Sequence, residues 1–277
     1  MKRELDLVTP GQPAMDGDGV KMTRMIGTPE LNLLDPFLLL DAFGSEQAED
    51  YIGGFPAHPH RGFETVTYLL AGRMRHKDSA GHEGVIEAGG VQWMTAGRGI
   101  VHSEMPEQED GLLQGFQLWV NLPASEKMQK PVYQEFPAAE IAHEYADNGS
   151  VVRVIAGRTN RGTRGPVANQ IVDPLYFDVS LPNQQRFEQR VEKDHNTFIF
   201  VIEGELSIGD EQGTRKLGIL TEGDEIVVFA RGDTRFLLIS GRPINEPVAR
   251  GGPFVMNTKA EVLQAFEDFQ TNRFLEK

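Results

Sequence analysis

The chain of 277 residues contains no cysteine, which excludes both disulfide bonds and thiolate metal sites. Any metal ion would therefore be bound by histidine, aspartate or glutamate. The absence of disulfides also fits the reducing cytoplasm, and a cytoplasmic protein is what we expect.

Positive charge is scarce, with 27 Lys and Arg residues against 41 Asp and Glu residues and a formal net charge of −14. Phosphate backbones and anionic membranes attract clustered basic residues, so we expect no direct nucleic-acid partner and no membrane partner. Long hydrophobic runs are also missing, because Asp35-Pro36 interrupts the most apolar stretch, residues 33–40. The basic start of the chain has no apolar run behind it, so we expect neither a signal peptide nor a membrane span.

What the sequence does contain is a series of short β-type segments separated by glycine turns. Residues 64–72 are rich in β-branched and aromatic residues and end at Gly72, and residues 116–120 form a similar segment. Further turns are expected at Gly89-Gly90 and at 97–99. This pattern is typical of an antiparallel β-sandwich or β-barrel.

The second half of the chain repeats this pattern. Residues 197–204 resemble residues 65–72, and residues 222–232 resemble residues 88–98, whereas a polar stretch at 123–137 separates the halves. Such a repeat indicates an internal duplication. We therefore predict an all-β protein of two tandem antiparallel barrels or jelly rolls, with domains at 1–123 and 124–277. Since a duplicated barrel can bury its own sheet faces, we expect a monomer.

A helix is predicted at the end of the chain. Thr258 followed by Glu261 is a capping-box pattern. Val262, Phe266 and Phe269 then recur at helical spacing and form an apolar stripe, which we expect to pack against the rest of the protein.

Two pairs of metal-binding residue types stand at strand spacing. In a β-strand residues i and i+2 share a face, so His58 and His60 would point to one side, as would His102 and Glu104. Either pair alone is more often a surface or core feature than a ligand pair. Together, in a β-rich chain without cysteine, they favour a metal site. Glu64 would lie on the same face as His58 and His60 in a straight strand, so it is an alternative carboxylate ligand.

The other histidines do not show this pattern. His76 and His82 stand in a polar stretch and are expected to be solvated, whereas His143 lies among acidic residues and His195 is solitary. The duplicated half offers no second ligand set, because the repeat offsets align the four candidate positions with Arg190, Glu192, Phe236 and Leu238. We therefore predict one metal site, in the N-terminal half.

The residues around these candidates resemble a known family. The stretches 58–70 and 99–106 are similar to the motifs of the pirin family, a branch of the bicupins in the cupin superfamily. Residues 252–258 resemble the C-terminal signature of the same family. The resemblance implies a bicupin fold in which His58, His60, His102 and Glu104 bind one divalent metal ion, most often Fe(II). It places Glu64 beside the ligand set rather than in it.

The resemblance implies two functions. Some pirins are described as quercetin 2,3-dioxygenases, which implies a ring-cleaving reaction of a flavonol-like substrate with O2. In that reaction Glu104, or a carboxylate beside it, would act as general base for the substrate hydroxyl. Other pirins are described as transcriptional or metabolic co-regulators, which implies an iron-dependent module that binds a protein partner.

Overall fold

The structure is a computed structural model that describes residues 1–169, 171–209 and 216–276. The chain is mostly β-strand and divides into two compact units. The first unit consists of Gln12–Ala138 and Ile244–Lys277, and the second unit consists of Met1–Gly11 and Ala139–Pro243. The predicted all-β, two-barrel architecture is confirmed. Within the described residues no helix is long and apolar enough to cross a membrane.

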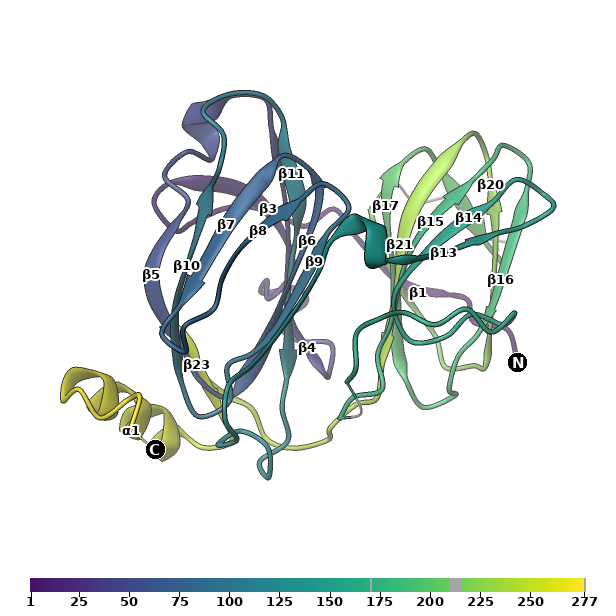
Figure 1. The fold of residues 1–277 in the computed structure, drawn as a ribbon. Helices are drawn as coiled ribbons and strands as arrows, with labels where there is room; N and C mark the ends of the chain where they lie inside the picture. Colours follow the sequence, from purple (N-terminus) through teal and green to yellow (C-terminus); the bar gives the residue numbers. More distant parts are fainter. Residues whose placement is uncertain (170, 210–215, 277) are drawn as a thin grey trace. The chain divides into compact units, whose positions relative to one another are not determined.

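The first unit packs two antiparallel sheets face to face (Figure 1). Its larger sheet has the order β12 (Val132–Phe136), β9 (Val91–Thr95), β6 (Phe63–Ala71), β11 (Leu113–Asn121), β4 (Phe37–Ser45), β3 (Val20–Ile26) and β2 (Gln12–Asp16). Its smaller sheet has the order β5 (Phe55–His60), β10 (Ile100–Pro106), β7 (Arg73–Asp78) and β8 (Glu83–Glu87). Leu69 of the larger sheet and Met74 and Ile86 of the smaller sheet share one buried cluster, so the core lies between the sheets.

The second unit repeats this arrangement. Its larger sheet has the order β1 (Leu5–Thr9), β19 (Leu217–Leu220), β17 (Asn196–Glu203), β21 (Thr234–Gly241), β15 (Leu175–Leu181), β14 (Val151–Ala156) and β13 (Ala142–Tyr145). Its smaller sheet has the order β16 (Arg186–Arg190), β20 (Glu225–Ala230) and β18 (Leu206–Ile208). Phe177 and Ile199 meet Leu206 and Val228 in a continuous apolar cluster that fills the interior.

The repeat inferred from the sequence holds for one pair of strands and fails for the other. β6 and β17 are both central in their larger sheets, as the similarity of 65–72 to 197–204 predicts. Residues 88–98, however, contain β9 of a larger sheet, whereas residues 222–232 contain β20 of a smaller sheet. The sequence alignment therefore matches two strands that do not occupy equivalent places in the two units. Phe236 and Leu238 consequently lie in β21, not opposite β16. The buried positions of β16 and β20 do not form a ligand set: they are Phe187, Gln189, Ile226, Val227, Val228 and Ala230.

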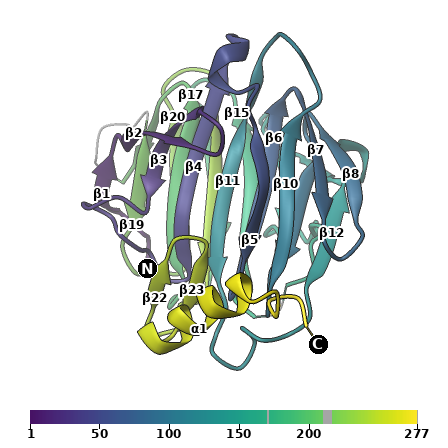
Figure 2. The ribbon, with the colours of Figure 1, turned by 90° about the vertical axis from the view of Figure 1, so that its left-hand side faces the viewer.

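The grouping of chain segments also differs from the contiguous domains at 1–123 and 124–277. β1 pairs with β19 at the edge of the second unit, although it precedes the first unit in the chain. Residues after 243 return to the first unit and form β22 (Ala249–Gly251), β23 (Phe254–Met256) and α1 (Lys259–Gln270) (Figure 2). The short 3-10 helices are η1 (Ala48–Asp50) and η2 (Ala138–Glu140). An edge strand is stabilised by any compatible unpaired edge, so local pattern alone does not assign it to a sheet.

A buried arginine connects the C-terminal segment to the rest of the first unit. The predicted capping box is present, since Thr258 accepts a hydrogen bond from the Glu261 amide and Glu261 caps in return. The Arg61 guanidinium forms a 2.7 Å ion pair with Asp268 of α1 and lies 4.5 Å from the centre of the Phe274 ring. Arg61 directly follows His60, so the C-terminal helix is connected to the strand that carries the candidate ligands.

We expect Phe254→Ala to destabilise the first unit specifically. Phe254 is 1% exposed and packs with Ala265 and Phe274, so its truncation should cost about 3–5 kcal/mol of unfolding free energy. Both tryptophans, Trp93 and Trp119, lie in the first unit, so tryptophan fluorescence during urea unfolding reports on this unit.

Phe229→Ala is the matched control, because Phe229 belongs to the second unit and is 42% exposed. It should leave the fluorescence transition nearly unchanged. An unchanged transition in Phe254→Ala would mean that the C-terminal segment does not stabilise the first unit.

Candidate metal centre

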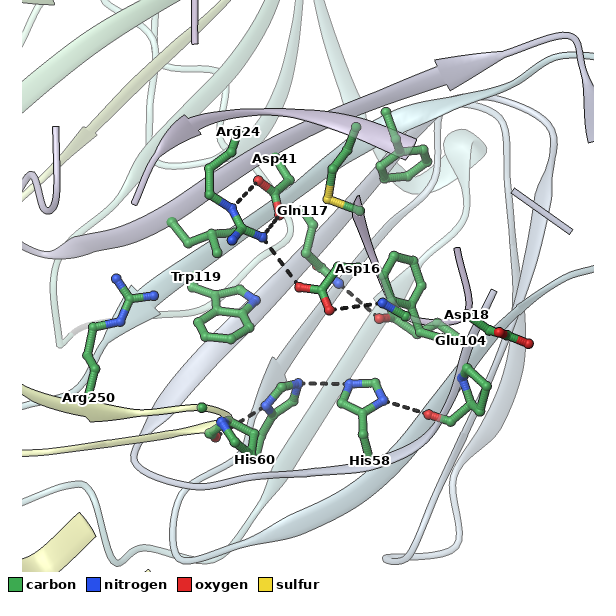
Figure 3. A pocket seen from close by; sticks show the side chains of 18 residues that line it. Asp16, Asp18, Arg24, Asp41, His58, His60, Glu104, Gln117, Trp119 and Arg250 are labelled. Carbon is green, nitrogen blue, oxygen red and sulfur yellow. Dashed lines mark hydrogen bonds and ion pairs between the residues drawn. The ribbon is translucent and has the colours of Figure 1, made fainter. Parts of the chain in front are cut away.

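Three histidine rings meet on the inner face of the smaller sheet in the first unit. β5 contributes His58 and His60, whose side chains share a face because residues alternate along a strand (Figure 3). β10 contributes His102, which lies directly opposite His58 in the antiparallel register. One ring nitrogen from each residue lies within 4.8 Å of the other two. The structure thus brings together the histidines that the alternation singles out, and the group could hold a metal ion.

Hydrogen bonds define which nitrogen of His58 and His60 is free. Nδ1 of His58 lies 2.8 Å from the Pro56 carbonyl oxygen, and Nδ1 of His60 lies 3.4 Å from the Pro253 carbonyl oxygen. A carbonyl oxygen only accepts, so we place the hydrogen of each neutral ring on Nδ1. Both Nε2 atoms then carry lone pairs, yet they lie 3.0 Å apart. Two lone pairs at that distance repel each other unless a proton or a cation lies between them.

His102 presents a third lone-pair nitrogen. Its Nε2 is buried and has no hydrogen-bond partner among the described residues. Burial, followed by the neighbouring histidines, lowers the pKa of His102 well below 6.5, and burial followed by His58 does the same for His60. These two rings are therefore neutral at physiological pH, which is the form that binds metals. The unpartnered Nε2 of His102 and the two facing Nε2 atoms of His58 and His60 would all be satisfied by one bound metal ion.

Glu104 lies beside this group without belonging to it. Its carboxylate is buried and accepts hydrogen bonds from Thr67 Oγ1 at 2.7 Å and Gln117 Nε2 at 2.9 Å. The register of β5 and β10 shifts between His102 and Glu104, which pairs Glu104 with Phe55. Along β10 the pairing with β7 is regular from His102 to Pro106, so the extra residue lies in β5, and His102 and Glu104 share a face as alternation predicts. Glu104 as fourth ligand remains a prediction.

Glu64 points away from the histidines, contrary to the straight-strand expectation. Gly62 separates β5 from β6 with a φ of +88°, and a Cβ there would lie 2.0 Å from the Val255 carbonyl oxygen. The chain therefore turns from the smaller sheet into the larger one. Thr67 faces Glu104, so Glu64, an odd number of residues away, lies on the opposite face of β6. There it accepts a 2.7 Å hydrogen bond from Thr95.

A cavity of about 750 Å³ opens from the histidines into the interior of the first unit (Figure 3). Part of its wall is apolar or aromatic and consists of Met22, Leu39, Phe43, Phe55, Pro56 and Trp119. The polar wall includes Arg24, whose guanidinium donates two hydrogen bonds to the Asp41 carboxylate, at 2.9 and 2.7 Å. Arg250 also lines it, donating to the Leu38 carbonyl oxygen at 2.9 Å and lying 5.8 Å from the Trp119 ring centre. A flat aromatic molecule with polar substituents suits such a cavity.

Sequence reasoning missed His76. The expectation that His76 and His82 are both solvated is wrong for His76, which lies in β7 and is completely buried, with its ring centre 5.3 Å from that of His102. His82 is partly exposed and lies 3.0 Å from the Asp78 carboxylate. The available signal was the spacing of His76 and Asp78, which is the same i, i+2 spacing as in the ligand pairs.

Comparisons with known proteins agree with one another. The family model described as Pirin matches residues 19–120, and the model described as Pirin C-terminal cupin domain matches residues 176–275. A pirin-like protein of Caulobacter vibrioides is 56% identical over 96% of this chain and 97% of its own length. Human pirin is 45% identical over 92% of this chain and 88% of its own length. The crystal structure of an Acinetobacter baumannii quercetin 2,3-dioxygenase, 36% identical, matches with a TM-score of 0.89 over 99% of both chains.

Substitution of the two candidate carboxylates should separate their roles. We expect Glu104→Gln to lower the affinity for Fe(II) by at least about 10-fold, because the charge next to the histidines is lost. Glu64→Gln should change the affinity little, because Glu64 lies on the other face of β6. Anaerobic titration of the metal-free proteins with Fe(II) measures both, and the reverse order would identify Glu64 as the ligand.

Proposed function

Because the chain belongs to the pirin family, we propose that it is a metal-dependent dioxygenase of the quercetin 2,3-dioxygenase type, opening the heterocycle of a flavonol-like substrate with O2. The observation that carries the proposal is the group of His58, His60 and His102 beside a cavity of about 750 Å³. The likeness to a solved quercetin 2,3-dioxygenase over almost the whole chain supports it.

In this proposal His58, His60, His102 and Glu104 hold one divalent ion, Fe(II). Imidazole together with carboxylate is a donor set that suits iron and leaves coordination positions open. When bound, the ion would supply Lewis acidity and a meeting place for the substrate oxygen and O2. The protein itself supplies three ring nitrogens already directed toward one place.

Glu104 is the proposed general base. It lines the cavity beside His58 and His60, where it can take the proton of a substrate hydroxyl. Thr67 and Gln117 hold one carboxylate oxygen each, which fixes the orientation of the carboxylate. The deprotonated substrate is electron-rich and combines with one O2, and the heterocycle opens with release of carbon monoxide. The apolar part of the cavity wall, which includes the buried Leu39 and Phe43, would limit the access of water to this step.

Arg250 is the proposed recognition group for the anionic substrate. Arg24 is already paired with Asp41, whereas Arg250 forms no ion pair among the described residues. The Arg250 side chain is exposed at the edge of the cavity, and an arginine guanidinium is charged at physiological pH. From beside Trp119 it can donate to an oxygen of a ring held against that indole.

A regulatory role is the second candidate. The net charge of −14 favours a protein partner over bare nucleic acid. In that case the metal state would change the surface that the partner binds, and the cavity would not turn over a substrate.

Turnover of quercetin distinguishes the two functions. We expect anaerobically prepared Fe(II) protein, mixed with quercetin and air, to lose the flavonol absorbance and release carbon monoxide. Glu104→Gln should reduce kcat by about 100-fold or more at equal metal content, because the base is lost. Absence of turnover with Fe(II), Mn(II), Ni(II) and Co(II), combined with partner binding that follows metal content, would favour the regulator.

Arg250→Gln should raise the KM for quercetin by about 10-fold while leaving metal content unchanged, because a hydrogen bond to a charged group contributes about 1.5–3 kcal/mol. Arg273→Gln is the control, since Arg273 is exposed and lies outside the cavity. Steady-state kinetics at matched metal content measures the effect. A KM equal to that of the control would remove Arg250 from substrate recognition.

A further inference from the structure

We propose that Asp78 and His76 form a carboxylate–histidine arm that holds His102 in the tautomer and orientation required to bind the metal. The arm rests on the proposed metal site, but not on the dioxygenase reaction. It makes His76 and Asp78 positioning residues, because neither of them lines the cavity.

The arm is built by two neighbouring strands of the smaller sheet. β7 lies beside β10, and its register places Asp78 opposite His102 and His76 opposite Glu104. Nε2 of His76 lies 3.1 Å from Oδ2 of Asp78, and Nδ1 of His76 lies 3.5 Å from Nδ1 of His102. Both side chains of the arm are completely buried. The hydrogen-bonded series therefore runs from Asp78 through His76 to the back of His102.

Only one placement of the hydrogens satisfies this series when the rings are neutral. The Asp78 carboxylate accepts from the backbone amides of Ala80 at 2.8 Å and His82 at 3.0 Å, so it acts as an acceptor. His76 must then donate from Nε2, which leaves its Nδ1 as an acceptor. His102 donates from Nδ1 to that atom and keeps its lone pair on Nε2. The opposite tautomer would set two acceptors against each other at 3.1 Å and would block His102 Nε2 with a hydrogen.

The surrounding side chains prevent His76 from turning away. The Tyr133 ring stacks on His76 at 4.9 Å and on His82 at 4.9 Å between ring centres. Gln92 in turn donates a 2.9 Å hydrogen bond to the Tyr133 hydroxyl. His76 is thus held between Tyr133 on one side and His102 on the other.

The arm also distinguishes His102 from the other two rings. His58 and His60 donate their Nδ1 hydrogens to neutral carbonyl oxygens, whereas His102 donates to a ring that is itself bonded to a carboxylate. A carboxylate behind a ligand histidine increases the electron density on the metal-facing nitrogen. His102 should therefore be the strongest donor of the three.

The test compares His76→Leu with His76→Gln in the full-length protein. Leucine removes both hydrogen bonds, whereas glutamine can donate to Asp78 and accept from His102. We expect His76→Leu to weaken Fe(II) binding by about 10–100-fold in an anaerobic competition titration, and His76→Gln to retain most of the affinity. His143→Ala, in the second unit, is the control.

A spectroscopic readout separates positioning from loss of structure. In the Cu(II)-loaded protein, pulsed electron paramagnetic resonance detects the remote Nδ1 of each bound imidazole, whose quadrupole coupling depends on its hydrogen bond. We expect one coupling that differs from the others in the wild type, its loss in His76→Leu, and its partial recovery in His76→Gln. Should His76→Leu fail to fold, Asp78→Asn is expected to shift the same coupling.

Two results would overturn the inference in different ways. Wild-type affinity together with unchanged couplings in His76→Leu and Asp78→Asn would reject the arm and leave the metal site standing. A wild-type protein that binds neither Fe(II) nor Cu(II) would reject the metal site, and the arm and the proposed function with it.

Discussion

The antiparallel pairing of β5 with β10 is the constraint on which the rest of the site depends. It sets His102 directly opposite His58, and alternation along β5 adds His60 from the same face. A change of register by one residue would turn these side chains to the other face of the sheet. The regular pairing of β10 with β7 keeps Glu104 on the same face as His102, so the two ladders together place the group of nitrogens and the carboxylate beside it.

Each ring of the group is held from behind by a different part of the chain. Pro56 precedes His58 in the same strand, Pro253 comes from the returning C-terminal segment, and His76 comes from β7. These contacts leave the opposite nitrogens with lone pairs in a place where burial disfavours protonation of His60 and His102. The site is therefore organised before any ligand arrives, and its organisation draws on segments far apart in the sequence.

Much of this could be predicted from local sequence pattern. Strand alternation predicted the grouping of the three histidines, and the capping box predicted α1. Alternation could not foresee that Gly62 turns the chain into the other sheet, so Glu64 was assigned to the wrong face. His76 was missed because its polar neighbours resemble a loop, although they are the outward-facing residues of β7. The assignment of β1 and the C-terminal segment to units likewise depends on pairing between distant segments.

The crossing of chain segments between the two units has a consequence for biosynthesis. A ribosome releases β1 long before β19, the strand it pairs with, so β1 must wait unpaired while the first unit emerges. Pro253, which holds His60, emerges only after the whole of the second unit. The nascent first unit consequently lacks one of the groups that orient the three histidines, so a metal ion bound by them would enter the complete group only after translation of both units.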